Sequence, residues 1–455
     1  MQKSFGHRAF TAVFLLLCLI PSLGMLLPDR REAAGSNEIL AAPPALRDGE
    51  GALDPDHLTA WTAWFQDSFF LRQELVTAWS ALNRQVLHTS IAEDVLLGKD
   101  GWLYFGGTLD DYTGRSLMSG REIASAARNL ALMSEYCESQ GAAFLFAAAP
   151  NKNSLYPQHM PDLPVFSREK NAEALADALA EEGVACLDLF AVFRAREETL
   201  YFAQDSHWNS RGAALAADKI NAALGRASGY FDGPFRPAAD HRGDLYAMLY
   251  PAGDRLESDP HYAGTLSFDY ETPIRSENDL NIRTSGGGTG SLLMFRDSFG
   301  NLLYPYLADS FARAQFSRTP AYRLDQIAAR EADCVVVELV ERNLRWLVEN
   351  IPVMPAPLRS AGEPEPLDEA AELTAEASRE MPGFVLVRGT LPAEPDEGAG
   401  IYLAAAEGWY EAFRLSGNGF GLYVPEAALT GETTLVCTTG GRQASLRTVR
   451  TEGAP

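Results

Sequence analysis

Three side chains that together can perform nucleophilic catalysis lie in two short motifs of this chain. Ser298 follows the apolar run 291–295 and precedes a stretch of helical character, which places it on a strand-to-helix turn. Asp205 and His207 are two positions apart, so both project to the same side of an extended loop. A carboxylate can fix the tautomer of an imidazole whose other nitrogen takes a proton from a serine hydroxyl. The two motifs therefore predict a Ser298–His207–Asp205 triad.

The tripeptide around the serine decides little alone, because Asp-Ser-Phe also occurs at 67–69 and 309–311. Only Ser298 follows an apolar strand, and the N-terminus of the next helix offers N–H groups and a positive dipole end to an oxyanion. A serine in that place can also simply cap the helix, and an isolated Asp-x-His is most often a surface turn. The prediction depends on both motifs being present.

Strands and helices alternate along the middle of the chain, which is typical of an α/β protein with a parallel sheet covered by helices. Such sheets place their functional sites at the carboxyl ends of the strands. Ser298, the Asn151-Lys152 loop and the Arg342-Asn343 turn all fall at predicted strand ends. The stretch 225–290 is polar and is expected to be irregular. Helices are predicted over 56–88, 122–140, 170–182, 210–224, 299–314 and 324–330, a hairpin over 95–105, and strands over 143–149, 184–189, 291–295 and 333–339.

The two ends of the chain differ from this central part. An apolar run within residues 1–28 predicts a secretory signal or a membrane anchor, without deciding between them. Residues 29–55 are predicted to be a tether, 56–354 the α/β domain, and 355–382 an acidic linker. Residues 383–455 alternate in short apolar runs, which favours a small β-sandwich-like domain. Its aromatic residues could form a sugar-stacking face or a core: Trp409, Tyr410, Phe413, Phe420 and Tyr423.

Composition limits the possible partners. The net charge of −23 and the pI near 4.7 argue against nucleic acid, because phosphate binding needs a basic surface. The cysteines form no close pairs and the histidines show no metal-ligand spacing. We therefore expect free thiols, no metal site and no cofactor.

Two stretches, 204–212 (Gln-Asp-Ser-His-Trp-Asn-Ser-Arg-Gly) and 295–301 (Phe-Arg-Asp-Ser-Phe-Gly-Asn), resemble the SGNH hydrolase superfamily. Within it, the chain is most similar to the alginate O-acetyltransferase branch (AlgX/AlgJ-like) and the related DHHW proteins. The sequence departs from ordinary SGNH enzymes at Arg296, which replaces the glycine of Gly-Asp-Ser. The Asp/His motif also precedes the serine, as in a circularly permuted, flavodoxin-like sheet. Weaker matches are spread over 98–104, 150–157, 243–245 and 338–343.

The resemblance implies an activity and roles for the three side chains. Ser298 would accept an acetyl group, His207 would act as general base and then acid, and Asp205 would orient His207. The acetyl group would pass from a membrane-bound O-acyltransferase partner to a hydroxyl of a secreted or cell-surface polysaccharide, which implies an exported protein. Two alternatives remain open: an acetyl esterase with the same triad, and a non-catalytic glycan-binding or assembly scaffold. Candidate oxyanion or substrate-positioning residues are Arg296, Arg342, Asn343, Asn151, Lys152 and Trp208.

Overall fold

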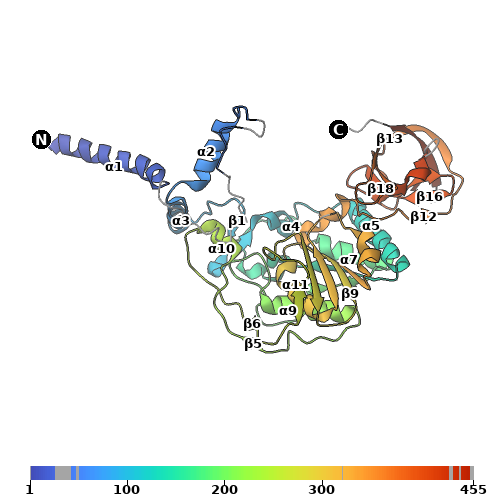
Figure 1. Cartoon of the computed structure of the whole chain (residues 1–455), viewed down its shortest axis with the longest axis horizontal. Coiled ribbons are helices and arrows are strands. Elements are labelled where there is room, and N and C mark those ends of the chain that lie inside the picture. Colours follow the sequence, from blue (N-terminus) through green and yellow to red (C-terminus); the bar gives the residue numbers. More distant parts are fainter. Residues whose placement is uncertain are drawn as a thin grey trace.

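The computed structural model describes residues 2–25, 43–47, 51–319, 321–429, 434–439 and 442–450. Most of the predicted tether, 29–55, lies outside these ranges. An α/β body occupies the middle of the molecule, with N-terminal helices on one side and a sheet of C-terminal strands on the other (Figure 1). The N-terminal helices are α1 (Gln2–Gly24), α2 (His57–Ser68) and α3 (Arg72–Leu82). None of the helices in the described ranges is long and apolar enough to cross a membrane.

The body contains a seven-stranded sheet in the order β4-β3-β11-β9-β10-β8-β7. The first five strands run parallel to one another, and β8 and β7 pair antiparallel at one edge. The α/β class is therefore confirmed for this part of the chain. The strands are β4 (Cys186–Leu187), β3 (Ala143–Ala149), β11 (Cys334–Val340), β9 (Ser291–Phe295), β10 (Arg313–Ser317), β8 (Asn281–Gly286) and β7 (Phe268–Tyr270).

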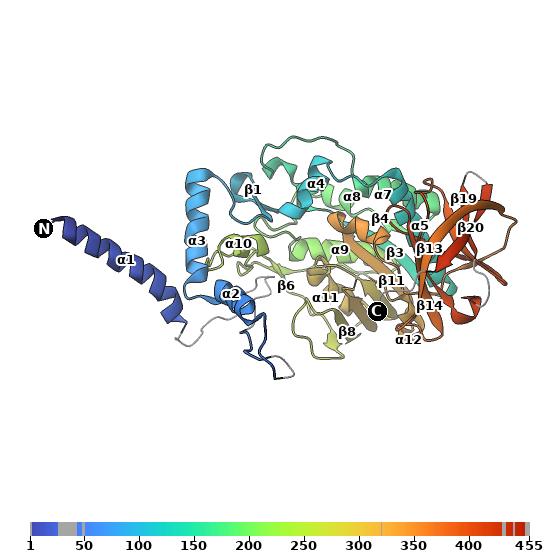
Figure 2. The ribbon, with the colours of Figure 1, turned by 90° about the horizontal axis from the view of Figure 1, so that it is seen from above.

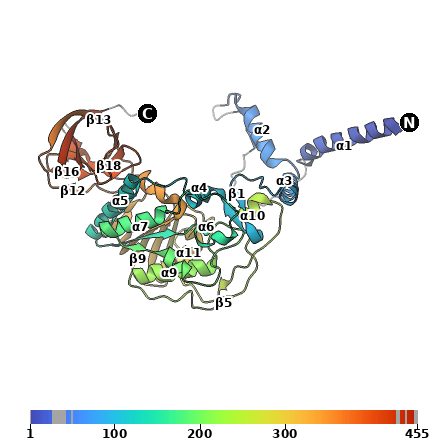
Figure 3. The same cartoon turned by 180° about the vertical axis from the view of Figure 1, so that it is seen from behind.

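Helices cover both faces of this sheet because its central strands are apolar on both sides. Along β11, Val335 and Val337 join the core under α5 (Gly120–Ser139) and α7 (Asn171–Glu182). Val336 joins the opposite core, under α9 (Ser210–Ala223) and α11 (Gly300–Ser310). Figure 3 shows the two helix pairs on either side of the strands. Alternation of side chains along each strand thus builds two cores, as a doubly covered sheet requires.

Two parts of the body differ from the prediction. The helix after Ser298 ends at Ser310, not near residue 314, because β10 begins at Arg313. The stretch 225–290, expected to be irregular, contributes the edge strand β7, its neighbour β8 and the short helix α10 (Asp244–Leu249). In β8, Ile282 and Thr284 are buried while their neighbours are not, which is a strand pattern too short to stand out in a polar segment. Figure 2 shows α10 beside α3.

The C-terminal strands form one nine-stranded sheet in the order β12-β16-β15-β19-β20-β13-β14-β18-β17. The prediction of a linker over 355–382 is wrong, because β12 and β13 of this sheet lie within that range. In β13, Ala371 and Leu373 face the core while Glu372 is exposed, so Glu372 lies on the outer face of a strand. The strands are β12 (Leu358–Arg359), β13 (Glu365–Ala377), β14 (Phe384–Thr390), β15 (Gly400–Ala405), β16 (Gly408–Glu411), β17 (Phe413–Arg414), β18 (Gly419–Pro425), β19 (Thr434–Thr439) and β20 (Arg442–Arg450).

Polar contacts join this sheet to α5. The buried carboxylate of Glu411 accepts hydrogen bonds from Arg128 of α5 and from Arg359, with N···O distances of 2.8 Å. Asn129, also buried on α5, donates to the carbonyl oxygens of Leu347 and Arg414 at 2.8 Å each. The five aromatic side chains singled out in this region are all buried, so they form core and no stacking face.

Candidate active site

Ser298 stands on a turn that is held by the side chain before it. β9 ends at Phe295 and α11 begins at Gly300. The buried Asp297 carboxylate accepts hydrogen bonds from the backbone N–H of Phe299 (2.9 Å) and of Val340 at the end of β11 (2.8 Å). The turn is therefore tied to the neighbouring strand, and Ser298 itself remains partly exposed.

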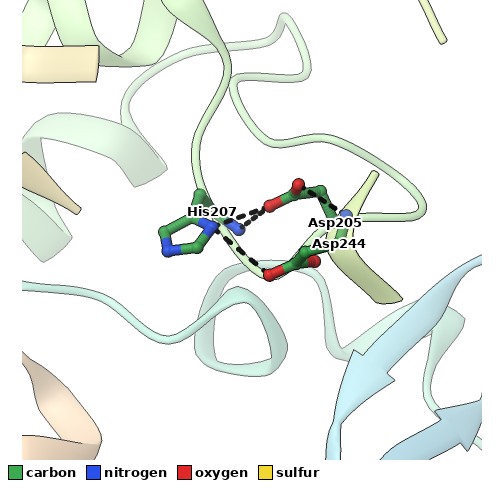
Figure 4. A group of neighbouring side chains, drawn as sticks. All are labelled: Asp205, His207 and Asp244. Atoms are coloured by element: carbon green, nitrogen blue, oxygen red, sulfur yellow. Dashed lines mark hydrogen bonds and ion pairs between the residues drawn. The ribbon is translucent and has the colours of Figure 1, made fainter. Parts of the chain in front are cut away.

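The structure places His207 between Ser298 and Asp205. The distance from His207 Nε2 to Ser298 Oγ is 2.9 Å, and from His207 Nδ1 to Asp205 Oδ1 it is 2.8 Å. The His207 backbone N–H also donates to Asp205 Oδ1, at 2.9 Å, as the one-residue spacing allows. Figure 4 shows the imidazole facing the Asp205 carboxylate. Three side chains from two distant motifs thus form one hydrogen-bonded chain.

The electrostatics of this chain suit a proton acceptor. Burial raises the pKa of Asp205, but the charge and hydrogen bond of His207, with His241, outweigh burial and hold it well below its ordinary value. Burial lowers the pKa of His207, but the carboxylates of Asp205 and Asp244 outweigh burial and raise it. Asp205 is therefore ionised, and His207 is a stronger base than a free imidazole.

Asp244, at the start of α10, is a second carboxylate beside the imidazole. Its Oδ2 lies 3.6 Å from His207 Nδ1 (Figure 4). The same oxygen accepts from the Ser206 hydroxyl at 2.6 Å. Its Oδ1 accepts from the Ser206 N–H at 2.8 Å. Asp205, His207 and Asp244 each offer a ligand atom, all within 4.8 Å of one another, yet every carboxylate oxygen of this group already accepts a hydrogen bond. These bonds join Asp205, His207 and Asp244 into one hydrogen-bond network.

Further support for the Asp205 loop comes from the polar stretch 225–290. His241 Nε2 lies 3.0 Å from Asp205 Oδ2, and the Asp244 N–H donates to the same oxygen at 2.9 Å. The Glu257 carboxylate accepts from the N–H groups of Ala203 (2.8 Å) and Gln204 (3.0 Å). Sequence reasoning missed His241 and Glu257, and it noted Asp244 only as part of the match at 243–245. No periodic pattern marks these residues.

Lys152 and Trp208 hold the backbone around the triad. The buried Lys152 ammonium donates to the carbonyl oxygens of Phe202, Ala203 and Asp205, at 3.2, 3.1 and 2.5 Å. Burial lowers the pKa of Lys152 to about 8. The Trp208 indole N–H donates to the carbonyl oxygen of Phe299 at 3.0 Å and so joins the two motifs directly. Both residues are placed to position the loop.

Three of the other candidates have partners within the fold. The Arg296 guanidinium donates to Asn301 Oδ1 (2.5 Å) and to the Glu277 carbonyl oxygen (2.6 Å). Asn343 donates to Asp297 Oδ2 at 2.8 Å. The backbone N–H of Asn151 donates to the Glu341 carboxylate at 3.0 Å, and its amide to Asp111 at 3.4 Å.

Arg342 differs from these three residues. No hydrogen bond or ion pair within the described ranges engages its guanidinium, which lies 5.5 Å from the centre of the Phe299 ring and 5.3 Å from that of Phe105. The Phe299 ring also contacts the His207 ring, at 4.9 Å between centres. Burial lowers the pKa of Arg342. Arg342 is the remaining cationic donor next to the triad.

Residues 95–278 match the family described as "SGNH hydrolase-like domain, acetyltransferase AlgX", a range that includes Asp205 and His207 and ends before Ser298. A curated relative, "Probable alginate O-acetylase AlgJ" from Pseudomonas syringae pv. tomato (strain ATCC BAA-871 / DC3000), is 26% identical over 246 residues. The match covers 51% of this chain and 58% of the relative, so the chain spans little more than half of that relative's length. The resemblance to the AlgX/AlgJ-like branch is confirmed by these matches.

The solved structures that this chain matches have low sequence identity to it. A DHHW family protein from Eubacterium siraeum is 15% identical with a TM-score of 0.42, covering 57% of this chain and 99% of that one. The O-acetyltransferase domain of Pseudomonas putida AlgJ is 16% identical with a TM-score of 0.38, covering 56% and 93%. Pseudomonas aeruginosa AlgX is 13% identical with a TM-score of 0.37, covering 72% and 85%.

Proposed function

We propose that this chain is an SGNH-type O-acetyltransferase that moves acetyl groups through Ser298 to hydroxyls of a secreted or cell-surface polysaccharide. The observation that carries the proposal is the hydrogen-bonded chain from Ser298 Oγ through His207 to Asp205. The match to an acetyltransferase family over residues 95–278 supports acetyl transfer as the chemistry. The named activity of the AlgJ relative supports a polysaccharide acceptor.

In the first half-reaction, Ser298 Oγ attacks the acetyl carbonyl of the donor and its proton passes to His207 Nε2. The bond between the acetyl carbon and the donor oxygen then breaks, and that oxygen takes the proton from His207. The Asp205 carboxylate stabilises the imidazolium that forms between these steps. The product is acetyl-Ser298 and a protonated leaving group.

In the second half-reaction, a sugar hydroxyl gives its proton to His207 Nε2 and attacks the acetyl carbonyl. The Ser298 Oγ–carbon bond breaks, and Ser298 takes the proton back. Each step places negative charge on the carbonyl oxygen. We assign the stabilisation of this charge to the Ser298 N–H and to the Arg342 guanidinium, which no hydrogen bond within the described ranges engages. A donor held next to the reacting carbonyl in this way typically contributes about 10²–10³ in rate.

The context of the reaction is also part of the proposal. The donor acetyl group comes from a membrane-bound O-acyltransferase partner, and the protein is exported and works outside the cytoplasm. Residues 56–354 form the catalytic domain with a circularly permuted motif order, and the sheet after it is a β-sandwich-like accessory domain.

The test is mass spectrometry of the peptide that contains Ser298 after incubation with p-nitrophenyl acetate. We expect an added acetyl group on Ser298, lost when an oligosaccharide acceptor is added and recovered on the sugar. Ser298→Ala should show no acetylation. If the acetyl group passes only to water when several acceptor oligosaccharides are present, the protein is an esterase and not a transferase. No acetylation of Ser298 in the wild-type protein would refute the proposal.

A further inference from the structure

Asp205 is bonded through both carboxylate oxygens, each facing a different histidine. Oδ1 accepts from His207 Nδ1 at 2.8 Å, and Oδ2 lies 3.0 Å from His241 Nε2. Because Asp205 is ionised, the His241 nitrogen that faces it carries the proton and donates. The two imidazoles thus hold the carboxylate from opposite sides.

His241 is fixed in a way that aims this hydrogen bond. Its ring stacks on Phe202, with 3.7 Å between ring centres and 7° between planes. Its backbone pairs with Glu257 in both directions, and the Glu257 side chain in turn holds the backbone N–H groups of the Asp205 loop. The stacking and the backbone pairing therefore fix the orientation of the imidazole that faces Asp205.

We propose that His241 is a positioning residue of the triad, whose Nε2–H holds Oδ2 of Asp205 so that Oδ1 remains aimed at His207. This role rests on the proposed function of Ser298, His207 and Asp205. A carboxylate held through one oxygen can turn about its Cβ–Cγ bond, and a second donor on the other oxygen removes that freedom. The Asp244 N–H reaches the same oxygen at 2.9 Å, so His241 is one of two donors to it.

The charged groups around His241 are mainly carboxylates. Asp205 faces its Nε2, Glu257 lies on the paired segment, and Asp259 and Asp244 lie nearby, while the Lys152 ammonium is bonded to the loop backbone. Burial lowers the pKa of His241, but the hydrogen bond and charge of Asp205, with the charges of Asp259 and Glu257, outweigh burial and raise it. The Asp205 carboxylate, 3.0 Å from Nε2, therefore favours the form of His241 that carries its proton on this nitrogen.

The experiment compares His241→Phe and His241→Gln in the full chain, with p-nitrophenyl acetate as the acetyl donor. Phenylalanine keeps the stacking on Phe202 and loses the N–H, whereas glutamine keeps an N–H donor of similar reach. We expect His241→Phe to lower kcat about tenfold with KM unchanged, and His241→Gln to restore most of it. Thermal unfolding of both variants checks that they fold.

A matched control lies twenty residues away. His261 Nε2 pairs with Asp240 Oδ1 at 3.1 Å, and both side chains are about half exposed. His261→Phe removes the same type of bond outside the triad and should leave kcat and KM at wild-type values.

The outcomes separate this role from the proposed function. If Ser298→Ala abolishes turnover while His241→Phe keeps wild-type kcat, the role of His241 is refuted and the triad stands. Equal losses of kcat in the Phe and Gln variants would also refute it, because the N–H would not be what matters. If Ser298→Ala leaves turnover unchanged, the proposed function fails and the role of His241 fails with it.

Discussion

The two ends of helix α11 carry the same tripeptide in opposite surroundings. At its beginning, Asp297-Ser298-Phe299 places the serine hydroxyl 2.9 Å from His207 Nε2. At its end, the hydroxyl of Ser310 in Asp309-Ser310-Phe311 donates to the carbonyl oxygen of Tyr306, one turn back, at 3.0 Å. The Ser310 oxygen also accepts from the Asn221 amide at 2.8 Å. One serine faces a base, and the other is a structural hydroxyl.

The difference follows from the direction of the helix and not from the tripeptide. The beginning of α11 lies at the carboxyl edge of the parallel strands, where loops converge and the helix N-terminus offers free N–H groups. The end of α11 lies at the other edge, where its carbonyl groups need donors, and Ser310 supplies one. A local motif provides a hydroxyl, and the topology of the sheet decides what that hydroxyl can do.

The largest expected effect on activity comes from removing the serine hydroxyl at the beginning of α11. Ser298→Ala should reduce acetyl turnover by about 10⁴-fold or more, because the nucleophile itself is lost. Its thermal stability should stay within about 0.5 kcal/mol of wild type, since the hydroxyl is partly exposed. Steady-state assays with p-nitrophenyl acetate measure the first effect and calorimetry the second. Substantial residual turnover would mean that another residue is the nucleophile.

A slightly smaller loss is expected from Asp205→Asn, about 10³–10⁴-fold in kcat, because the amide no longer supports the imidazolium of His207. The pH profile sharpens this prediction. In the wild type, activity should fall as the pH drops through the raised pKa of His207, above its ordinary value of about 6.5. Removing the Asp205 charge removes the main cause of that rise, so the acid limb of kcat/KM should move to lower pH. An unmoved acid limb would argue against His207 as the base.

Lys152→Met tests whether the loop that carries His207 must be held in place. The variant leaves three carbonyl oxygens without their ammonium donor, and we expect a loss of stability of about 1–3 kcal/mol. We also expect about a tenfold fall in kcat, since small misplacement of a base is costly. Denaturant unfolding and steady-state kinetics measure the two effects. Wild-type kcat in a destabilised variant would show that the loop keeps its shape alone.

The smallest effect is expected at the other end of α11. Ser310→Ala should leave kcat and KM at wild-type values and cost about 1 kcal/mol of stability, the usual value of a hydrogen bond between neutral groups. Ser68→Ala, in the third copy of the tripeptide, should also keep wild-type kinetics. A loss of activity in either variant would undo the contrast between the two ends of the helix.

The parts of the fold that the sequence predicted are those with a strong local pattern. The strands 143–149 and 291–295 match β3 and β9, and the helix near 122–140 matches α5 within two residues at each end. The last two strands of the sheet, β8 and β7, were missed, because they are short and lie in a polar segment. The segment that forms β13 was interpreted as a linker, because its composition is rich in Pro, Ala and Glu.

The candidate site shows the same limit. Sequence placed Asn151, Arg296 and Asn343 at the right edge of the sheet, yet each donates to another residue of the fold, because position along a strand does not fix where a side chain points. Asp244 and His241 reach Asp205 from nearly forty residues away, and such contacts exist only after folding. The catalytic roles themselves remain predictions until they are tested.

The junction between α5 and the C-terminal sheet has a practical consequence for anyone who wishes to express a shorter protein. A version cut after residue 354 would remove the Glu411 carboxylate that binds Arg128 and the Arg414 carbonyl oxygen that accepts from the Asn129 amide. Both Arg128 and Asn129 lie on α5, which covers the central strands. The cut would also uncover apolar side chains of α5 that pack in one cluster with Phe413 and Tyr423, and exposed apolar surface favours aggregation, so trimming should begin at the N-terminus.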